Sequence, residues 1–98
     1  MQRYEGRVAL VTGAGTGIGK SAALALCEAG YATVFVGRRQ APLDEAVALA
    51  KGKALAVSAD VGKPAEVDAL FARVKKEYGR LDVLFNNAGT GAPAVPLE

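Results

Sequence analysis

Short runs of apolar residues alternate with helix-forming stretches along the whole chain. Each run is almost entirely apolar or β-branched and is bounded by glycine or polar residues, which is typical of strands buried on both faces of a parallel sheet. These predicted strands span residues 7–12, 33–36, 54–59 and 81–85. The stretches between them predict helices over 17–29, from about Pro42 to Gly52, and over 64–78. The order βαβαβαβ predicts an α/β fold.

Residue spacing predicts which side of each helix is buried. In the helix over 64–78, apolar residues recur at i, i+3, i+4, i+7 and i+11, which marks one face of an α-helix. This face comprises Val67, Leu70, Phe71, Val74 and Tyr78. The expected buried face of the helix over 17–29 comprises Ile18, Ala22, Ala25, Leu26 and Ala29. In the middle helix, Pro42 suits the first turn, and Asp44 and Glu45 suit the positive end of the helix dipole.

The connections between the strands predict the topology. Parallel strands need crossover helices, and such crossovers are right-handed in nearly all proteins. We therefore predict a single domain, residues 1–98, with a Rossmann-type doubly wound parallel sheet, truncated to four strands in the order 3-2-1-4. The fourth strand would then lie at an open edge with Val83, Leu84 and Phe85. Because an unpaired edge can pair with another chain, we expect a homo-oligomer, edge-strand association or marginal stability.

Composition excludes several other classes of protein. The chain is 51% hydrophobic and 22% charged with a net charge of +2, which is an ordinary balance for a globular domain and predicts no nucleic-acid partner. No apolar run approaches the ~20 residues of a membrane span, and no signal-peptide pattern precedes the first strand. Cys27 is the sole cysteine, which excludes an internal disulfide and fits a reducing compartment. We expect Cys27 to be buried and the protein to be cytoplasmic.

The first predicted strand leads into a stretch with glycine at every second position from Gly13 to Gly19. Such a turn brings free backbone N–H groups to the start of a helix, which is a site for phosphate. A mononucleotide P-loop is one interpretation, because Ala14-x-x-x-x-Gly19-Lys20-Ser21 differs from G-x-x-x-x-G-K-[ST] only in its first residue. Lys20 would then contact the β- and γ-phosphates, and Ser21 would bind Mg²⁺. A dinucleotide site is the other, although Ile18 breaks the general pattern G-x-G-x-x-G.

Polar residues at the ends of the later strands favour the dinucleotide. Ligands of α/β proteins bind at the carboxyl ends of parallel strands, where Arg38-Arg39, Asp60-Val61 and Asn86-Asn87-Ala88-Gly89 are expected. Thr12-Gly13-x-x-x-Gly17-x-Gly19 followed about 70 residues later by Asn-Asn-Ala-Gly resembles the short-chain dehydrogenase/reductase family. The resemblance covers nearly the whole chain. It implies NAD(P)-dependent hydride transfer between nicotinamide and a carbonyl/alcohol pair.

The resemblance also implies a role for individual residues. Gly13 would form the turn, Gly17 would let the backbone approach the pyrophosphate, and Gly19 would let the helix pack on the strand. Asp60 resembles the family aspartate that binds the adenine amino group, or else it caps the helix near Pro64. Asn86 is expected to tie the fourth strand to its neighbours. The expected cofactor-binding residues are Gly13, Gly15, Thr16, Gly17, Ile18, Gly19, Arg38, Arg39, Asp60, Val61, Asn87, Ala88 and Gly89.

The end of the second strand predicts which cofactor is preferred. In the family, an acidic residue there holds the adenosine ribose and selects NAD. This chain instead has Gly37 followed by Arg38 and Arg39, and an arginine can pair with a 2′-phosphate through charge-assisted hydrogen bonds. We therefore predict that NADP(H) is preferred over NAD(H). Thr16 departs from this pattern, because some NADP-preferring relatives place a basic side chain in the glycine loop.

The family's catalytic residues are a Tyr-x-x-x-Lys pair and a serine beyond the fourth strand. Tyr4, Tyr31 and Tyr78 each lack a lysine four residues later. We therefore predict that the chain is the cofactor-binding N-terminal portion of a dehydrogenase, with no catalytic residue, no metal site and no turnover of its own. The alternatives are a non-catalytic dinucleotide-binding or self-associating module, and a P-loop nucleotide hydrolase.

Overall fold

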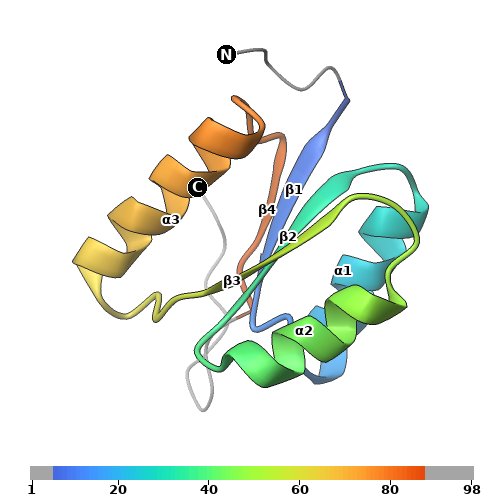
Figure 1. Cartoon of the computed structure of the whole chain (residues 1–98), viewed down its shortest axis with the longest axis horizontal. Coiled ribbons are helices and arrows are strands. Elements are labelled where there is room, and N and C mark those ends of the chain that lie inside the picture. Colours follow the sequence, from blue (N-terminus) through green and yellow to red (C-terminus); the bar gives the residue numbers. More distant parts are fainter. Residues whose placement is uncertain (1–5, 88–98) are drawn as a thin grey trace.

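A computed structural model describes residues 6–87 and shows parallel strands alternating with helices (Figure 1). The elements in chain order are β1 (Val8–Thr12), α1 (Gly17–Glu28), β2 (Ala32–Gly37), α2 (Gln40–Leu49), β3 (Ala54–Ser58), α3 (Pro64–Glu77) and β4 (Val83–Phe85). The sheet order is β3-β2-β1-β4, and every pair of neighbouring strands is parallel. The predicted Rossmann-type order 3-2-1-4 is therefore confirmed. Strand bounds differ from the prediction by one or two residues.

The strand β1 lies at the centre of the sheet and is buried along its whole length. It pairs with β2 from Val8↔Ala32 to Thr12↔Val36, and with β4 on its other side. Figure 1 shows α1 and α2 on one face of the sheet and α3 on the other. Because helices cover both faces, successive side chains of β1 and β2 enter two separate cores. Val34 faces the core that contains Leu70, and Phe35 faces the core that contains Leu43.

The buried face of α1 differs from the predicted one. The residues that are buried lie four apart: Gly19, Ala23 and Cys27. The burial predicted for Cys27 is thus confirmed, but the predicted face is wrong. Its members are exposed or only half-buried: Ile18 (73% exposed), Ala22, Ala25, Leu26 and Ala29. The reason is a close backbone contact, since α1 rotates to bring Gly19 against the carbonyl of Gly13.

The two remaining helices also correct the predicted details. In α3, Leu70 and Val74 are buried as predicted, but the side chain of Phe71 is 39% exposed. Residues on a helix are about 100° apart, so Phe71 lies at the margin of the buried stripe. The helix α2 begins at Gln40 rather than Pro42, and its first turn contains no acidic residue. The Asp44 carboxylate lies one turn further along the helix and accepts a hydrogen bond from Nε2 of the Gln40 side chain (2.8 Å).

Side-chain hydrogen bonds hold the short strand β4 in place at its amino end. The Val8 N–H donates to Oδ2 of Asp82 (2.8 Å), and the Asp82 N–H donates to the Val8 carbonyl (2.8 Å). The Arg80 guanidinium donates two hydrogen bonds to the same carboxylate, at 2.9 and 2.7 Å. Hydrogen bonding by Arg80, followed by that of the Val8 N–H, lowers the pKa of Asp82. This arrangement joins β4 to the central strand although β4 is only three residues long.

Candidate functional site

The loop between β1 and α1 is compact because two glycines and an asparagine meet there. Gly13 has a φ of +64°, and a Cβ on it would lie 2.6 Å from the Asn87 carbonyl oxygen. A Cβ on Gly19 would overlap the Gly13 carbonyl and lie 2.8 Å from Nδ2 of Asn87. The Ala14 N–H donates to the Val36 carbonyl (3.0 Å), which ties the loop to the end of β2. No side chain larger than hydrogen fits at Gly13 or Gly19 without moving the backbone.

The amino end of α1 is open in the same place. Its first residue, Gly17, has a φ of +59°, and no atom lies within 4 Å of the position of its Cβ. Within residues 6–87, no side chain caps this helix: Thr16 precedes it in an extended conformation without a capping hydrogen bond. Its first turn contains no acidic residue either. These free N–H groups and the positive end of the helix dipole can bind an anion.

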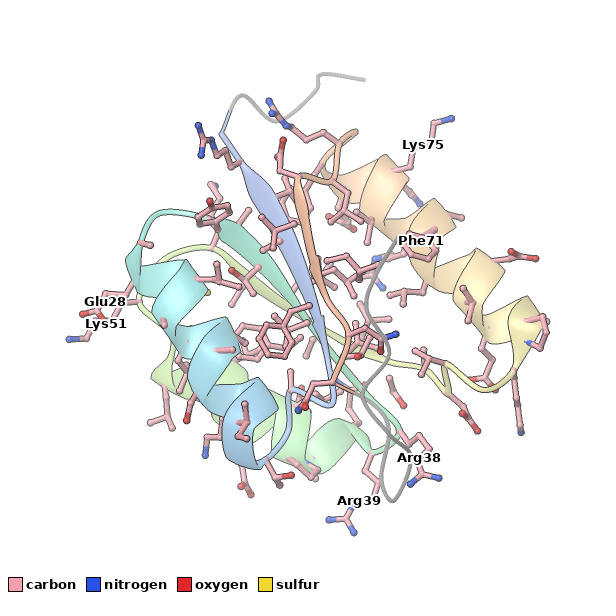
Figure 2. All side chains as sticks on the ribbon, turned by 180° about the vertical axis from the view of Figure 1, so that it is seen from behind. Glu28, Arg38, Arg39, Lys51, Phe71 and Lys75 are labelled. Carbon is pink, nitrogen blue, oxygen red and sulfur yellow. The ribbon has the colours of Figure 1, made fainter. Side chains whose placement is uncertain are left out.

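A hollow of about 460 Å³ lies beside this helix end and reaches the amino end of α2. It joins the glycine loop to the turn after β2. Its lining residues are Gly15, Thr16, Gly17, Lys20, Arg39, Ala41, Pro42 and Glu45. Arg39 thus lines the hollow and Arg38 does not. Figure 2 shows that both arginine side chains project outward from the turn after β2.

Thr12 connects the glycine loop to the end of β4. Its hydroxyl accepts a hydrogen bond from the Asn87 N–H (2.7 Å) and donates one to Oδ1 of Asn86 (2.9 Å). Thr12 is only 4% exposed, so water does not compete strongly for these bonds. The predicted role of Asn86, to tie β4 to its neighbour, is confirmed. These bonds also place Asn87 over Gly13 and Gly19.

Asp60 follows β3 and forms a tight turn. Its Oδ1 accepts from the Gly62 N–H (2.9 Å), and its own N–H donates to Oε1 of Glu66 (2.7 Å). The Asp60 carboxylate does not cap α3, because the residue that precedes that helix is Lys63 and no side-chain capping hydrogen bond is present there in the described part of the chain. Asp60 is joined to the first turn of α3 only through its own N–H, which donates to Glu66. Within residues 6–87, Oδ2 of Asp60 makes no hydrogen bond and can accept one from a ligand.

The carboxyl ends of all the parallel strands lie along one edge of the sheet, and most of the expected site residues gather there. Val61 is half-buried and packs against the core that contains Leu70. Ile18 is the most exposed large apolar residue among residues 6–87. The expected residues Ala88 and Gly89 lie outside the described residues.

Among residues 6–87, no group of three or more potential ligands could hold a metal ion. In the same range, no helix is long and apolar enough to cross a membrane.

Some residues at this site were not among those expected to bind the cofactor. Thr12 belongs to the sequence motif, but its hydrogen-bond partners lie 74 and 75 residues away, which no local pattern reveals. Only the P-loop interpretation gives Lys20 a ligand to bind, and Glu45 is expected only to suit the dipole of its helix. The spacing of Thr16 and Lys20 is the one signal that could have identified Lys20, since residues four apart share a helix face.

Comparison with known proteins agrees with this geometry. Residues 7–98 match the family model described as short chain dehydrogenase. Oxidoreductase asL5 of Sarocladium schorii is 42% identical over 97 residues, which cover 99% of this chain and 39% of the relative. The 3beta-hydroxysteroid dehydrogenase of Mediterraneibacter gnavus is 41% identical over 101 residues, covering 100% of this chain and 37% of the relative. The chain thus spans well under half the length of these relatives.

Solved structures have the same fold. The 3-ketoacyl-(acyl-carrier-protein) reductase from Brucella melitensis, complexed with NADH, is 39% identical with a TM-score of 0.77, covering 82% of this chain and 33% of that one. The L-sorbose reductase from Gluconobacter frateurii, complexed with NADPH and L-sorbose, is 37% identical with a TM-score of 0.84. That match covers 92% of this chain and 36% of the other.

Proposed function

The chain belongs to the short-chain dehydrogenase family, and on that premise we propose that it forms the part of an oxidoreductase that binds the nicotinamide dinucleotide. The observation that carries this proposal is the open amino end of α1, where Gly17 leaves room for a ligand and no side chain within residues 6–87 caps the helix. The pyrophosphate would lie there, on the backbone N–H groups at the start of α1. The reaction of the whole enzyme would be hydride transfer between nicotinamide and a carbonyl/alcohol pair.

The remaining strand ends support the adenosine half of the cofactor. Oδ2 of Asp60 would accept a hydrogen bond from the adenine amino group, with Val61 beside it. Asn87 lies next to the glycine loop because Thr12 holds its backbone, and it would continue with Ala88 and Gly89 along the ribose. Two solved relatives are complexed with NADH and NADPH respectively, which supports a nicotinamide cofactor of either kind.

We further propose that NADP(H) is the preferred cofactor. The residue that ends β2 is Gly37, so the acidic residue that selects NAD in the family is absent from this position. Arg38 and Arg39 follow at once, and Arg39 lines the hollow beside the glycine loop. Guanidinium groups bind phosphate through charge-assisted hydrogen bonds, each worth about 1.5–3 kcal/mol.

Replacing Arg38 by Asp tests this preference. The new carboxylate would repel the 2′-phosphate and accept hydrogen bonds from a ribose, so the ratio of NADPH to NADH affinity is expected to fall by about tenfold or more. Calorimetric titration of the 98-residue chain measures both affinities. Lys51→Asp, at an exposed site remote from the glycine loop, makes the same change of charge as a control. An unchanged ratio in Arg38→Asp would remove the proposed preference.

Binding without turnover is the expected behaviour of the 98 residues. They contain no Tyr-x-x-x-Lys pair, so nothing in them can serve as the family's general acid. Titration with NADPH, NADH and Mg·ATP distinguishes this proposal from the P-loop alternative. ATP binding that needs Mg²⁺ and is lost in Lys20→Ala would overturn the dehydrogenase function. Asp60, the aspartate that a P-loop protein would use for its metal, lies beyond β3 and is separated from β1 by β2.

A second proposal concerns association of copies of the chain. Within residues 6–87, β4 pairs with β1 on one side only, and Phe85 on its end is 37% exposed. An open edge of this kind presents free backbone hydrogen-bonding groups to another strand. We propose that the 98-residue chain self-associates through this edge.

We also propose that the protein is located in the cytoplasm, which cell fractionation tests.

A further inference from the structure

The hollow beside the glycine loop is lined by charged side chains from two helices. Lys20 extends from the first turn of α1, Arg39 directly precedes α2, and Glu45 lies on the second turn of α2. The Lys20 N–H donates to the Thr16 carbonyl (3.3 Å), so these two residues are stacked on the same face of α1. The Lys20 side chain therefore begins one turn behind Thr16, on the side that faces the hollow.

Neither of the two cations at this hollow, Lys20 and Arg39, forms an ion pair within residues 6–87. The ion pairs in that part of the chain involve Lys63, Arg73 and Arg80. The positive end of the α1 dipole opens at Gly17, on the same hollow. With two cations against one carboxylate and a helix amino end, the hollow carries a net positive charge that attracts an anion.

We propose that Lys20 is a further cofactor-specificity residue, and that its ammonium group contacts the adenosine 2′-phosphate opposite Arg39. This inference rests on the proposed dinucleotide function. With the pyrophosphate at the start of α1, the adenosine ribose would lie beside Gly15 and Thr16. Both residues line the same hollow as Lys20 and Arg39, so a phosphate on that ribose would enter the hollow that the two cations line. Lys20 thus supplies the basic group that Thr16 does not.

Glu45 opposes this interaction from the other wall of the hollow. Its carboxylate lines the same cavity as Lys20 and Arg39, and it repels a phosphate dianion by the same electrostatics that attract one to the cations. A nicotinamide dinucleotide without the 2′-phosphate brings only its pyrophosphate to the hollow, on the backbone N–H groups at the start of α1. The balance between Lys20 and Glu45 therefore acts more strongly on NADPH affinity than on NADH affinity.

The test compares ligands that differ only in the 2′-phosphate. Calorimetry on the 98-residue chain measures NADPH against NADH, and adenosine 2′,5′-bisphosphate against 5′-AMP, so that the nicotinamide is not needed for the result. Lys20→Gln is expected to weaken binding of both 2′-phosphorylated ligands about tenfold and the other two less than about twofold. Lys20→Arg retains the charge and is expected to retain the affinity. Lys75→Gln on α3 removes the same charge far from the hollow and is the matched control (Figure 2).

Glu45→Gln provides an independent measurement, because a gain of affinity does not arise from misfolding. This variant is expected to bind NADPH about threefold more tightly and to change NADH affinity by less. If Lys20→Gln weakens both dinucleotides equally or neither of them, the role of Lys20 is overturned, while NADH binding by the unchanged chain keeps the proposed function. If the unchanged chain binds no dinucleotide, the proposed function fails and this inference fails with it.

Discussion

At the scale of single residues, the site depends on the lack of a side chain at Gly17 and at Gly19. Gly19 has no side chain because the backbone of Gly13 occupies the place of its Cβ, whereas Gly17 faces open space. The two glycines therefore serve different purposes. The contact at Gly19 stabilises the fold, and the space at Gly17 receives the ligand. Replacement by alanine should therefore mainly reduce stability at Gly19 and mainly reduce ligand binding at Gly17.

Gly19→Ala and Gly17→Ala separate these two purposes. The first forces α1 away from the loop, and we expect it to lower the free energy of unfolding by about 1–3 kcal/mol. The second costs about 1–2 kcal/mol because of the positive φ, but it places a methyl group in the space proposed for the pyrophosphate. For Gly17→Ala we therefore expect the loss of NADPH binding free energy to exceed the loss in the free energy of unfolding. Urea denaturation and calorimetry measure both effects, with Ser21→Ala on the exposed side of α1 as the control. Equal effects of the two glycine variants on stability and on binding would contradict this assignment.

The hydroxyl of Thr12 is the second residue whose chemistry can be isolated. Thr12→Val keeps the shape of the side chain but leaves the Asn87 N–H and the Asn86 amide oxygen without their partner. We expect a loss of about 1–3 kcal/mol of stability and faster hydrogen exchange at the Asn87 amide. Thr12→Ser retains the hydroxyl and should retain the slow exchange. The role given to Thr12 would be refuted if both variants exchanged at the same rate.

At the scale of elements, β4 is stabilised by its ends more than by its length. Three residues of ladder join it to β1, while Asp82 at one end and Thr12 at the other add hydrogen bonds to the adjoining backbone. The rotation of α1 about its own axis is likewise decided by a single close contact. The close approach at Gly19 turns α1 so that small residues, rather than the most apolar ones, face the sheet.

The carboxylate of Asp82 makes stability depend on pH. Its pKa is lowered from the ordinary 3.8 in the folded chain, chiefly by Arg80, so the folded state binds its proton less readily than the unfolded state does. The resulting stabilisation is present above pH 3.8 and is lost as the pH falls below that value toward the folded pKa. Asp82→Asn should therefore be less stable at pH 7 and should lose less stability upon acidification. Thermal denaturation between pH 2 and 7 tests this, with Glu77→Gln in the exposed pair with Arg73 as the control. Parallel pH curves for the unchanged chain and Asp82→Asn would contradict it.

At the scale of the whole molecule, helices enclose the centre of the sheet while the β4 edge stays open within residues 6–87. The two exposed phenylalanines occupy different places relative to this edge. Phe85 lies on the edge strand, and Phe71 lies on α3 (Figure 2). Association through the strand would involve the first, and simple hydrophobic adhesion would involve both.

Phe85→Lys is expected to suppress the proposed self-association, because a charged residue on an edge strand disfavours pairing with another strand. Phe71→Lys adds the same charge and removes an equally exposed ring, 39% against 37%, and it should leave association unchanged. Sedimentation velocity over a range of concentrations provides the measurement. If the unchanged chain is monomeric throughout, or if both variants have the same effect, the edge is not the interface.

The sequence by itself determined the sheet and the family. Strands buried on both faces must be almost continuously apolar, and their alternation with helices leaves few topologies, so the order 3-2-1-4 could be predicted. The glycine motif and the Asn-Asn-Ala-Gly stretch were equally local and could be identified directly. Such features depend on residues that are close together in the sequence, so they can be identified without the tertiary structure.

Only the tertiary structure decided which face of α1 is buried, which residues meet at the hollow, and what Thr12 binds. Periodicity identifies an apolar stripe on a helix, but the contact between Gly19 and Gly13 sets the rotation that is adopted. Lys20 and Glu45 lie on different helices, and Thr12 lies 75 residues from Asn87. These contacts depend on how β1, α1, α2 and β4 pack together. That packing is a property of the whole domain and of no single segment.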